Sequence, residues 1–384
     1  MVTVANIVGA RPQFIKYWPV SQAIEGHNET SSNVIKDILI HTGQHYDYLM
    51  SKVFFEEFGL RDPDYHLGVG SSSHGRQTGE IMARMEEALQ TEKPDLVLVY
   101  WDTNSTLGGR LAAAKLHITV AHVEAGLRSF NKYMPEEINR VLTDHISSIL
   151  FCPSQVAVNN LRREGLTRAL HDGQLMILNP SATGVNRQLP DVSPDNPLVV
   201  NIGDIMYDVL LCAQALATHP PQIMKELKLN PKSYYLMTLH RAENTESLER
   251  LAEIIEFVNA ISKGQSVIFP MHPRTRKVLD HSGLRFADNV VMIEPLGYFD
   301  MIFLLKHSSI LLTDSGGLQK EAYWLQVPCI TLRDETEWLE TVESGWNVLF
   351  RDYHGQHHPS SSGETAYGDG QAATRIVNLI SAMR

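Results

Sequence analysis

Short apolar runs alternate with amphipathic helical stretches along nearly the whole chain of 384 residues, and this alternation is the strongest constraint on its fold. Such runs, each followed by helical periodicity, are typical of βα units, whose strands pair in parallel between helices on both faces. The sequence therefore predicts an α/β protein with parallel sheets. The expected strands are 3–8, 37–41, 96–100, 118–122, 149–152, 234–239, 266–271, 290–293, 310–313 and 329–332, and the clearest helices are 77–89 and 247–261.

The length of the chain and one polar segment predict two domains. A chain of 384 residues exceeds what one hydrophobic core usually serves. The stretch LNPSATGVNRQLPDVSPDNP is rich in Pro, Asn, Asp and Ser, and LVVNIGDIMYDVLL after it begins again as a strand and a helix. We therefore expect two βα domains, at 1–185 and 195–365, with a ligand bound where their strand ends face each other.

Charge and composition exclude several classes of protein. The net charge of -11 at pH 7 disfavours nucleic acid and anionic membranes as partners. No apolar stretch reaches the roughly 18 residues of a membrane-spanning helix, and the first residues read as a strand and a turn rather than a signal peptide. Because Cys152, Cys212 and Cys329 lie far apart in the sequence, we expect reduced thiols in a cytoplasmic protein.

The motifs of several other enzyme classes are missing. The chain has 17 histidines, but it has no HExxH motif, and HGQHHPSSSGE is expected to be a solvated loop. We therefore expect no metal centre. GxGxxG does not follow the first strand and GxxxxGK[ST] does not occur, which argues against a dinucleotide cofactor and against ATPase or kinase chemistry.

Glycines and basic residues gather in the strand-end loops of the second half. In TDSGGLQKEA, Ser315, Gly316 and Gly317 lie between a buried strand and a helix, where free backbone N–H groups can hold a phosphate. Glu321 lies about one turn later and suits the hydroxyls of a sugar or ribose. The basic side chains that could neutralise a diphosphate there are His240, Arg241, His272 and Arg274.

Carboxylates occupy the corresponding loops of the first half. Asp102, Glu124 and the pair Glu136 and Glu137 follow consecutive strands or begin helices. Carboxylates that cluster in a partly dry site have separated pKa values, so that some can donate protons while others accept them. Simpler explanations remain open: Asp102 could cap the next helix, and the two glutamates could favour a helix start. Because adjacent side chains diverge, at most one glutamate should face the ligand.

The order of these motifs resembles the non-hydrolysing UDP-N-acetylglucosamine 2-epimerases. The resemblance covers nearly the whole chain, and it rests on GARPQFIK, TGQH, DTNST, HVEAGLR, PEEINR, HRAENT, HPRT, DSGGLQKEA and LRDETEW. It implies two Rossmann-like domains in the glycosyltransferase-B arrangement, with the substrate in the interdomain cleft. It also implies that the last helix, within 371–384, packs back on the first domain, that no NAD or metal is needed, and that the protein is a homodimer.

The resemblance also implies a reaction and the residues that perform it. UDP-GlcNAc and UDP-ManNAc would interconvert by loss of UDP to a glycal and its return, with acid/base groups on both faces of C2. The implied catalytic residues are Asp102, Glu124 and Glu136. With Arg241 and His272 from the basic loops, the substrate-binding candidates are Arg11, Lys16, His240, Ser315, Gly316, Gly317, Glu321 and Arg333. Gln44 and His45 of the TGQH loop are candidates for an allosteric site that binds UDP-GlcNAc.

Two departures from the family pattern leave alternatives open. The family has Gly before the catalytic Asp, and this chain has Trp101, which either crowds the pocket or points away from it. Tyr46 and Tyr48 stand in the TGQH loop where polar residues are common, so allosteric activation is open. The alternative functions are a 2-epimerase of UDP-2,3-diacetamido-2,3-dideoxyglucuronate, a glycosyltransferase of the same fold, and an inactive protein that binds nucleotide sugars.

Overall fold

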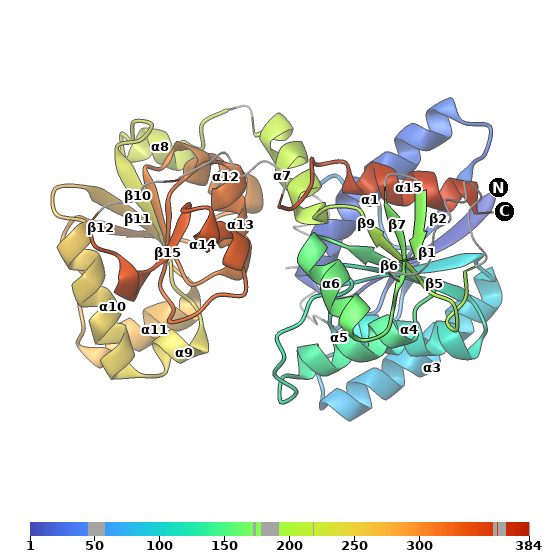
Figure 1. Cartoon of the computed structure of the whole chain (residues 1–384). Helices are drawn as coiled ribbons and strands as arrows, with labels where there is room; N and C mark the ends of the chain where they lie inside the picture. Colours follow the sequence, from blue (N-terminus) through green and yellow to red (C-terminus); the bar gives the residue numbers. More distant parts are fainter. Residues whose placement is uncertain are drawn as a thin grey trace. The chain divides into compact units, whose positions relative to one another are not determined.

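The computed structural model describes residues 1–44, 58–171, 174–177, 192–217, 219–355, 359 and 366–383. These residues form two compact units, Met1–Val209 with Tyr367–Arg384 (unit 1) and Leu210–Ala366 (unit 2). Each unit is a parallel sheet with helices around it (Figure 1). The predicted α/β class with parallel sheets is therefore confirmed. No helix in the described part of the chain is long and apolar enough to cross a membrane.

The sheet of unit 1 has nine strands in its described residues, and all neighbours are parallel except the last pair. In spatial order the strands are β3 (Tyr65–His66), β2 (Ile35–His41), β1 (Val2–Val8), β4 (Leu96–Tyr100), β5 (Thr119–Val123), β6 (Ile149–Cys152), β9 (Leu198–Asn201), β7 (Arg168–His171) and β8 (Gln174–Ile177). The helices are α1 (Arg11–Thr30), α3 (His74–Glu92), α4 (Asn104–Lys115), α5 (Pro135–His145), α6 (Gln155–Arg163) and α15 (Ala372–Ala382), and α7 (Ile205–Leu216) begins here and enters unit 2.

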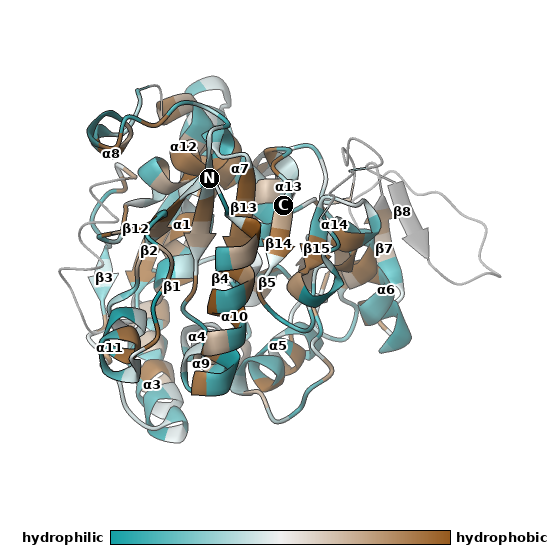
Figure 2. Ribbon diagram, turned by 90° about the vertical axis from the view of Figure 1, so that its left-hand side faces the viewer, coloured by the Kyte–Doolittle hydropathy of each residue, from teal (hydrophilic) through white to brown (hydrophobic). Residues whose placement is uncertain are grey.

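The two faces of this sheet are buried by different helices. One face packs against α1 and α15, in a core that includes Phe14 and Ile376. The other face packs against α3 and α4, in a core that includes Met85 and Ala112. Figure 2 shows the central strands mostly in brown, whereas helices such as α3 also carry teal residues. The strands are apolar because both of their faces are covered.

Strand β9 differs from the sequence prediction. We expected this strand to open the second domain, but it pairs in parallel with β6 of the first sheet. Leu198–Asn201 is apolar enough for either sheet, and its hydrogen bonds to Ile149–Cys152 place it in unit 1. The chain passes to unit 2 inside α7 instead. Helix α15 returns to unit 1, where the Asp208 carboxylate accepts hydrogen bonds from the first two backbone N–H groups of that helix at 3.1 and 2.9 Å.

Unit 2 has a six-stranded sheet in its described residues, and every neighbouring pair is parallel. The strands in spatial order are β12 (Val290–Ile293), β11 (Ser266–Pro270), β10 (Tyr234–Thr238), β13 (Ile310–Thr313), β14 (Cys329–Thr331) and β15 (Asn347–Leu349). The helices are α8 (Gln222–Glu226), α9 (Ala242–Thr245), α10 (Leu248–Ile261), α11 (Pro273–Ser282), α12 (Tyr298–His307), α13 (Gly316–Trp324), α14 (Leu339–Glu343) and the 3₁₀ helix η1 (Phe350–Asp352).

The loop after β1 is held against the end of β4 by one buried side chain. The Gln13 Oε1 atom accepts hydrogen bonds from the N–H groups of Gly9 and Ala10 at 2.8 and 3.0 Å. Its Nε2 group donates to the Tyr100 carbonyl at 2.8 Å. A Cβ on Gly9 would lie 2.0 Å from Ser105 Oγ, so only glycine allows this close approach. The Gln13 side chain therefore joins the carboxyl ends of β1 and β4.

Alanine at two glycines of this segment should have opposite effects on stability. Gly9→Ala should lower the free energy of unfolding by about 1–3 kcal/mol, because its Cβ overlaps packed side chains. Gly26→Ala should raise that free energy by about 0.5–1 kcal/mol, because Gly26 lies within α1 with no atom near its Cβ position. Urea unfolding of both variants measures the difference. Equal effects would contradict the packing described for Gly9.

Candidate active site

Asp102 stands where the chain leaves β4 and enters α4. Thr103, not Asp102, caps that helix, since its hydroxyl accepts a hydrogen bond from the Thr106 N–H at 3.3 Å. The capping explanation for Asp102 is therefore wrong. The Asp102 carboxyl group is 1% exposed and points toward a cavity at the end of the sheet.

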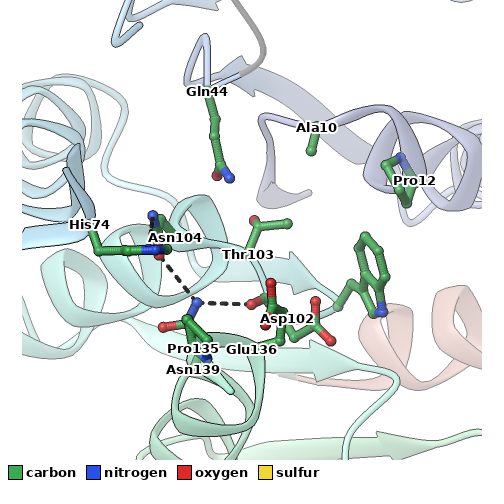
Figure 3. Close-up of a pocket in the computed structure, with 11 residues that line it drawn as sticks. Ala10, Pro12, Gln44, His74, Asp102, Thr103, Asn104, Pro135, Glu136 and Asn139 are labelled. Carbon is green, nitrogen blue, oxygen red and sulfur yellow. Dashed lines mark hydrogen bonds between the residues drawn. The ribbon is translucent and has the colours of Figure 1, made fainter. Parts of the chain in front are cut away.

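The cavity is formed by loops at the carboxyl ends of the strands of unit 1, and it has a volume of about 270 Å³. Figure 3 shows Asp102 and Glu136 close together at one wall, with Gln44 reaching in from another loop. The structure thus brings together two of the three predicted catalytic carboxylates. The lining residues are Ala10, Pro12, Gln44, His74, Trp101, Asp102, Thr103, Asn104, Pro135, Glu136 and Asn139.

Arg140 of α5 is the charge partner of Asp102. Its Nη2 group lies 2.5 Å from Asp102 Oδ2, and Asp102 Oδ1 has no hydrogen-bond partner among the described residues. Burial raises the pKa of Asp102, and the positive charges of Arg140 and Lys16 only partly offset it. The pKa of Asp102 therefore lies above its ordinary value. This carboxyl group is suited to exchanging a proton with a bound molecule.

Glu136 and Glu137 have different roles, as their adjacency predicts. Glu136 is exposed and lines the cavity, whereas Glu137 is buried. The Glu137 carboxylate accepts hydrogen bonds from the N–H groups of Ser129 and Phe130 at 2.9 and 3.0 Å, and from Arg140 Nη1 at 2.7 Å. Burial would raise the pKa of Glu137, but these hydrogen bonds lower it overall. Glu137 therefore holds the loop and Arg140 in place.

Glu124 pairs with Lys16 and is not among the residues that line the cavity. Its Oε2 atom is 2.8 Å from Lys16 Nζ, and both side chains are almost fully buried. The Lys16 ammonium group lies 4.4 Å from the centre of the Trp101 ring. Trp101 lines the cavity, and the charges of Lys16 and Glu124 act on the carboxyl group of Asp102, which lines it too. This settles where Trp101 points: it lies in the pocket wall.

The other candidates of unit 1 lie around the same strand ends. Arg11 is exposed at the first position of α1. Gln44 Oε1 accepts hydrogen bonds from the N–H and the hydroxyl of Ser105 at 2.9 and 2.6 Å, which ties the TGQH loop to α4. His45, Tyr46 and Tyr48, on which the question of allosteric activation depends, lie outside the described residues.

In unit 2, Asp314 organises the loop after β10. Its buried carboxylate accepts hydrogen bonds from the N–H groups of His240 and Arg241 at 2.9 and 2.8 Å, and it pairs with His240 Nδ1 at 3.0 Å. Burial would raise the pKa of Asp314, but the contacts with His240 and these N–H groups lower it overall. The exposed His272 ring lies 6.5 Å from the His240 ring, so these basic residues gather at neighbouring strand ends.

The glycine loop after β13 has one closed and one open position. Ser315 precedes α13, and its N–H donates to Thr313 Oγ1 at 2.9 Å. A Cβ on Gly316 would lie 2.7 Å from Glu337 Oε1, whereas a Cβ on Gly317 would meet only Ser315 Oγ at 4.0 Å. The backbone at Gly317 therefore borders open space at a helix N-terminus, where an anion is favoured.

Two further candidates of unit 2 already contact other side chains. Glu321 Oε1 accepts a hydrogen bond from the Tyr298 hydroxyl at 2.8 Å. Arg333 pairs with Glu243 at 2.8 Å and with Glu337 at 2.9 Å. A ligand that binds Arg333 would have to share or displace one of these carboxylates.

The described residues contain no group of three His, Cys, Asp or Glu side chains placed to hold a metal ion. Part of the HGQHH segment lies outside those residues. Sequence reasoning did not single out Arg140, Gln13 or Asp314. The signal for Arg140 was the helical spacing in PEEINR, which places it three residues after one glutamate and four after the other.

Comparison with known proteins finds relatives of the same fold and identifies the family of this chain. The sequence profile described as UDP-N-acetylglucosamine 2-epimerase matches residues 28–381. A UDP-N-acetylglucosamine 2-epimerase homolog from Methanococcus maripaludis is 46% identical over 98% of this chain and 99% of its own length. The UDP-2,3-diacetamido-2,3-dideoxy-D-glucuronate 2-epimerase of Pseudomonas aeruginosa is 44% identical over 98% of this chain and 99% of its own. The UDP-GlcNAc 2-epimerase of Methanocaldococcus jannaschii, in a crystal structure with UDP-GlcNAc and UDP, is 39% identical with a TM-score of 0.75, and the match covers 99% of both chains.

The fold and the site define a two-unit α/β protein whose polar groups collect at the carboxyl ends of parallel strands, where such folds bind ligands. Within that class, the chain belongs to the UDP-N-acetylglucosamine 2-epimerase family. The resemblance drawn from its motifs is confirmed.

Substitution of two buried aspartates should change stability with opposite dependence on pH. The folded state raises the pKa of Asp102, so its contribution to stability is lost as pH rises through the folded pKa. Asp102→Asn should therefore gain stability relative to the wild type as pH rises from about 4 to about 8. Burial would raise the pKa of Asp144, but His122, Arg128 and the Gly126 N–H together lower it overall, so Asp144→Asn should lose stability relative to the wild type as pH rises from about 2 to about 4.

Urea unfolding at several pH values measures both differences. If Asp102→Asn instead lost stability relative to the wild type as pH rose, the raised pKa of Asp102 would be contradicted.

Proposed function

We propose that this protein is a non-hydrolysing 2-epimerase that interconverts UDP-GlcNAc and UDP-ManNAc. The observation that carries the proposal is the pairing of Asp102 and Glu136 in one cavity, in a chain of this family. One carboxyl group there is buried beside Arg140 with a raised pKa, and the other is exposed. Two acid/base groups of different character suit removal of a proton from one face of a carbon and its return to the other.

The reaction needs loss of UDP before a proton can leave C2. The C2–H bond of GlcNAc is not acidic, because the acetamide carbonyl does not activate it. Departure of UDP breaks the C1–O bond and leaves an oxocarbenium-like centre, which acidifies the C2 proton. A carboxylate then takes that proton, which forms a glycal. Protonation of C2 on the opposite face and return of UDP to C1 give the epimer, so atoms and charges balance.

Unit 2 would hold the UDP. The Ser315–Gly317 loop offers backbone N–H groups to a phosphate, and His240 and Arg241 offer positive charge to the departing diphosphate. Glu321 would accept hydrogen bonds from ribose hydroxyls. In unit 1, Arg11 and Lys16 would contact the nucleotide sugar, and Glu124 would be the third acid/base group. The homodimer and the cytoplasmic location implied by the sequence stay predictions.

A second substrate is favoured by one observation. The Pseudomonas aeruginosa relative, at 44% identity, is a 2-epimerase of UDP-2,3-diacetamido-2,3-dideoxy-D-glucuronate. The same chemistry at C2 would serve that sugar, which carries an added carboxylate at C6. Both UDP-sugars are therefore tested.

The proposal is tested by incubating the protein with each UDP-sugar in D₂O and following the sugar by NMR. Deuterium at C2 together with the epimeric product supports the proposal, and the sugar that reacts faster is the substrate. Free UDP and ManNAc would indicate a hydrolysing enzyme instead. Unchanged sugar despite binding of UDP would indicate an inactive binding protein, and UDP release only with an acceptor would indicate a glycosyltransferase.

Neutral substitutions of the two cavity carboxylates should abolish exchange without loss of UDP binding. Asp102→Asn and Glu136→Gln should each slow deuterium incorporation at C2 by at least about 100-fold, because each removes a proton acceptor. UDP affinity, measured by calorimetry, should change less than about twofold. Glu87→Gln on the exposed face of α3 is the matched control. Exchange that survives Asp102→Asn would refute the role given to Asp102.

A methyl group at Gly317 should weaken UDP binding. The Cβ of Gly317→Ala would enter the open space at the start of α13, where we place a phosphate. The dissociation constant for UDP should rise at least about tenfold, with the stability of the fold unchanged or slightly increased. Calorimetry measures the first effect and thermal unfolding the second. Unchanged UDP affinity would place the diphosphate elsewhere.

A further inference from the structure

Two of the proposed catalytic groups depend on backbone in the left-handed region. Trp101, which precedes Asp102, has φ of +58°, and Glu124 has φ of +71°. Residues with a Cβ rarely adopt this conformation, and a bulky residue does so only where the surrounding structure holds it there. The direction of the Asp102 side chain follows from the backbone of Trp101, so the contacts that hold Trp101 also position Asp102.

The backbone N–H and the backbone carbonyl of Trp101 both contact residues of strand β5. Its N–H donates to the Val123 carbonyl at 3.1 Å. Its carbonyl oxygen lies 2.7 Å from His122 Nε2, and the His122 ring is fully buried. These two contacts join Trp101, the residue before Asp102, to His122 and Val123, the two residues before Glu124.

The other ring nitrogen of His122 contacts Asp144, which in turn forms an ion pair with Arg128. The Nδ1 atom of His122 lies 2.6 Å from Asp144 Oδ1, and Asp144 Oδ2 lies 2.7 Å from Arg128. The Trp101 carbonyl can only accept a hydrogen bond, so Nε2 of His122 is the donor in that contact. His122, Asp144 and Arg128 are all shielded from solvent, which keeps this arrangement rigid.

We propose that His122 is a positioning residue, which donates to the Trp101 carbonyl, keeps Trp101 in its left-handed conformation and so aims Asp102 at the sugar. The inference rests on the epimerase function proposed above. It deepens that function, because it names the contact that supports Trp101 in a backbone conformation that favours glycine. A glycine would adopt this backbone conformation without support. The need for His122 should therefore depend on which residue stands at position 101.

Two neutral amides separate the two contacts of the ring. His122→Asn places an amide N–H where Nδ1 lies, so it keeps the contact with Asp144 and loses the one with Trp101. His122→Gln places an amide N–H where Nε2 lies, so it keeps the contact with Trp101. Each substitution is also made with Trp101→Gly. Val120→Ala, a cavity-forming change at a fully buried residue of the same strand, is the control for general loosening of β5.

The experiment measures kcat, KM, C2 deuterium exchange and the midpoint of thermal unfolding for these proteins. His122→Asn should lower kcat about 10- to 100-fold with KM changed less than about threefold, because a displaced acid/base group affects the reaction more than binding. His122→Gln should keep at least about fivefold more activity than His122→Asn. With Trp101→Gly, the loss of kcat caused by His122→Asn should fall below about threefold. Val120→Ala should leave kcat unchanged.

Several results would overturn the inference. A His122→Asn protein with wild-type kcat would do so. The inference would also fail if His122→Asn lowered kcat by the same factor, and the unfolding midpoint by the same amount, whether Trp or Gly stood at position 101. If neither His122 variant folds, Trp101→Gly and Trp101→Ala decide, since only glycine adopts the left-handed region freely, and equal kcat values would refute the strain. Wild-type protein that never exchanges deuterium would refute the epimerase instead, and the coupling of unfolding midpoints would still test the contact.

Discussion

Burial of carboxylates at the carboxyl edge of the first sheet is the constraint on which the rest of unit 1 depends. An ionised carboxyl group taken out of water needs a cation or several N–H donors beside it. Asp102 and Glu137 share the guanidinium of Arg140, Glu124 has Lys16, and Asp144 contacts Arg128 and His122. These pairs fix where α1 and α5 meet the strand ends. Burial raises the pKa of Asp102 in spite of its partner Arg140, whereas the partners of Glu137 and Asp144 outweigh burial and lower their pKa values.

At several places in the site, one residue stabilises the loop and its neighbour faces the cavity. Thr103 caps α4, which leaves Asp102 directed at the cavity. Glu137 accepts the backbone N–H groups of its loop, which leaves Glu136 exposed at the cavity wall. In unit 2, Asp314 holds the backbone of His240 and Arg241. In each case a polar group that makes several hydrogen bonds stabilises the loop that carries the neighbouring site residue.

The sequence was sufficient for features that depend on local pattern. Apolar runs identified the strands that carry the site, and the motif order identified the family. Features that depend on long-range pairing could not be found in this way. The apolar pattern of Leu198–Asn201 would suit a strand of either sheet, and only its hydrogen bonds to β6 assign it to unit 1. The ion pair of Lys16 with Glu124 and the hydrogen bonds of Gln13 join residues far apart in the chain, and no local spacing encodes them.

Trp101 shows how a departure from a family pattern can be accommodated physically. The left-handed backbone at this position explains why glycine is suited to it, and a tryptophan there carries a conformational cost. That cost is offset on two sides, because His122 binds the carbonyl and the Lys16 ammonium packs against the ring. The ring of Trp101 therefore forms part of the pocket wall, while its backbone is joined to β5 through Val123 and His122 next to Asp102.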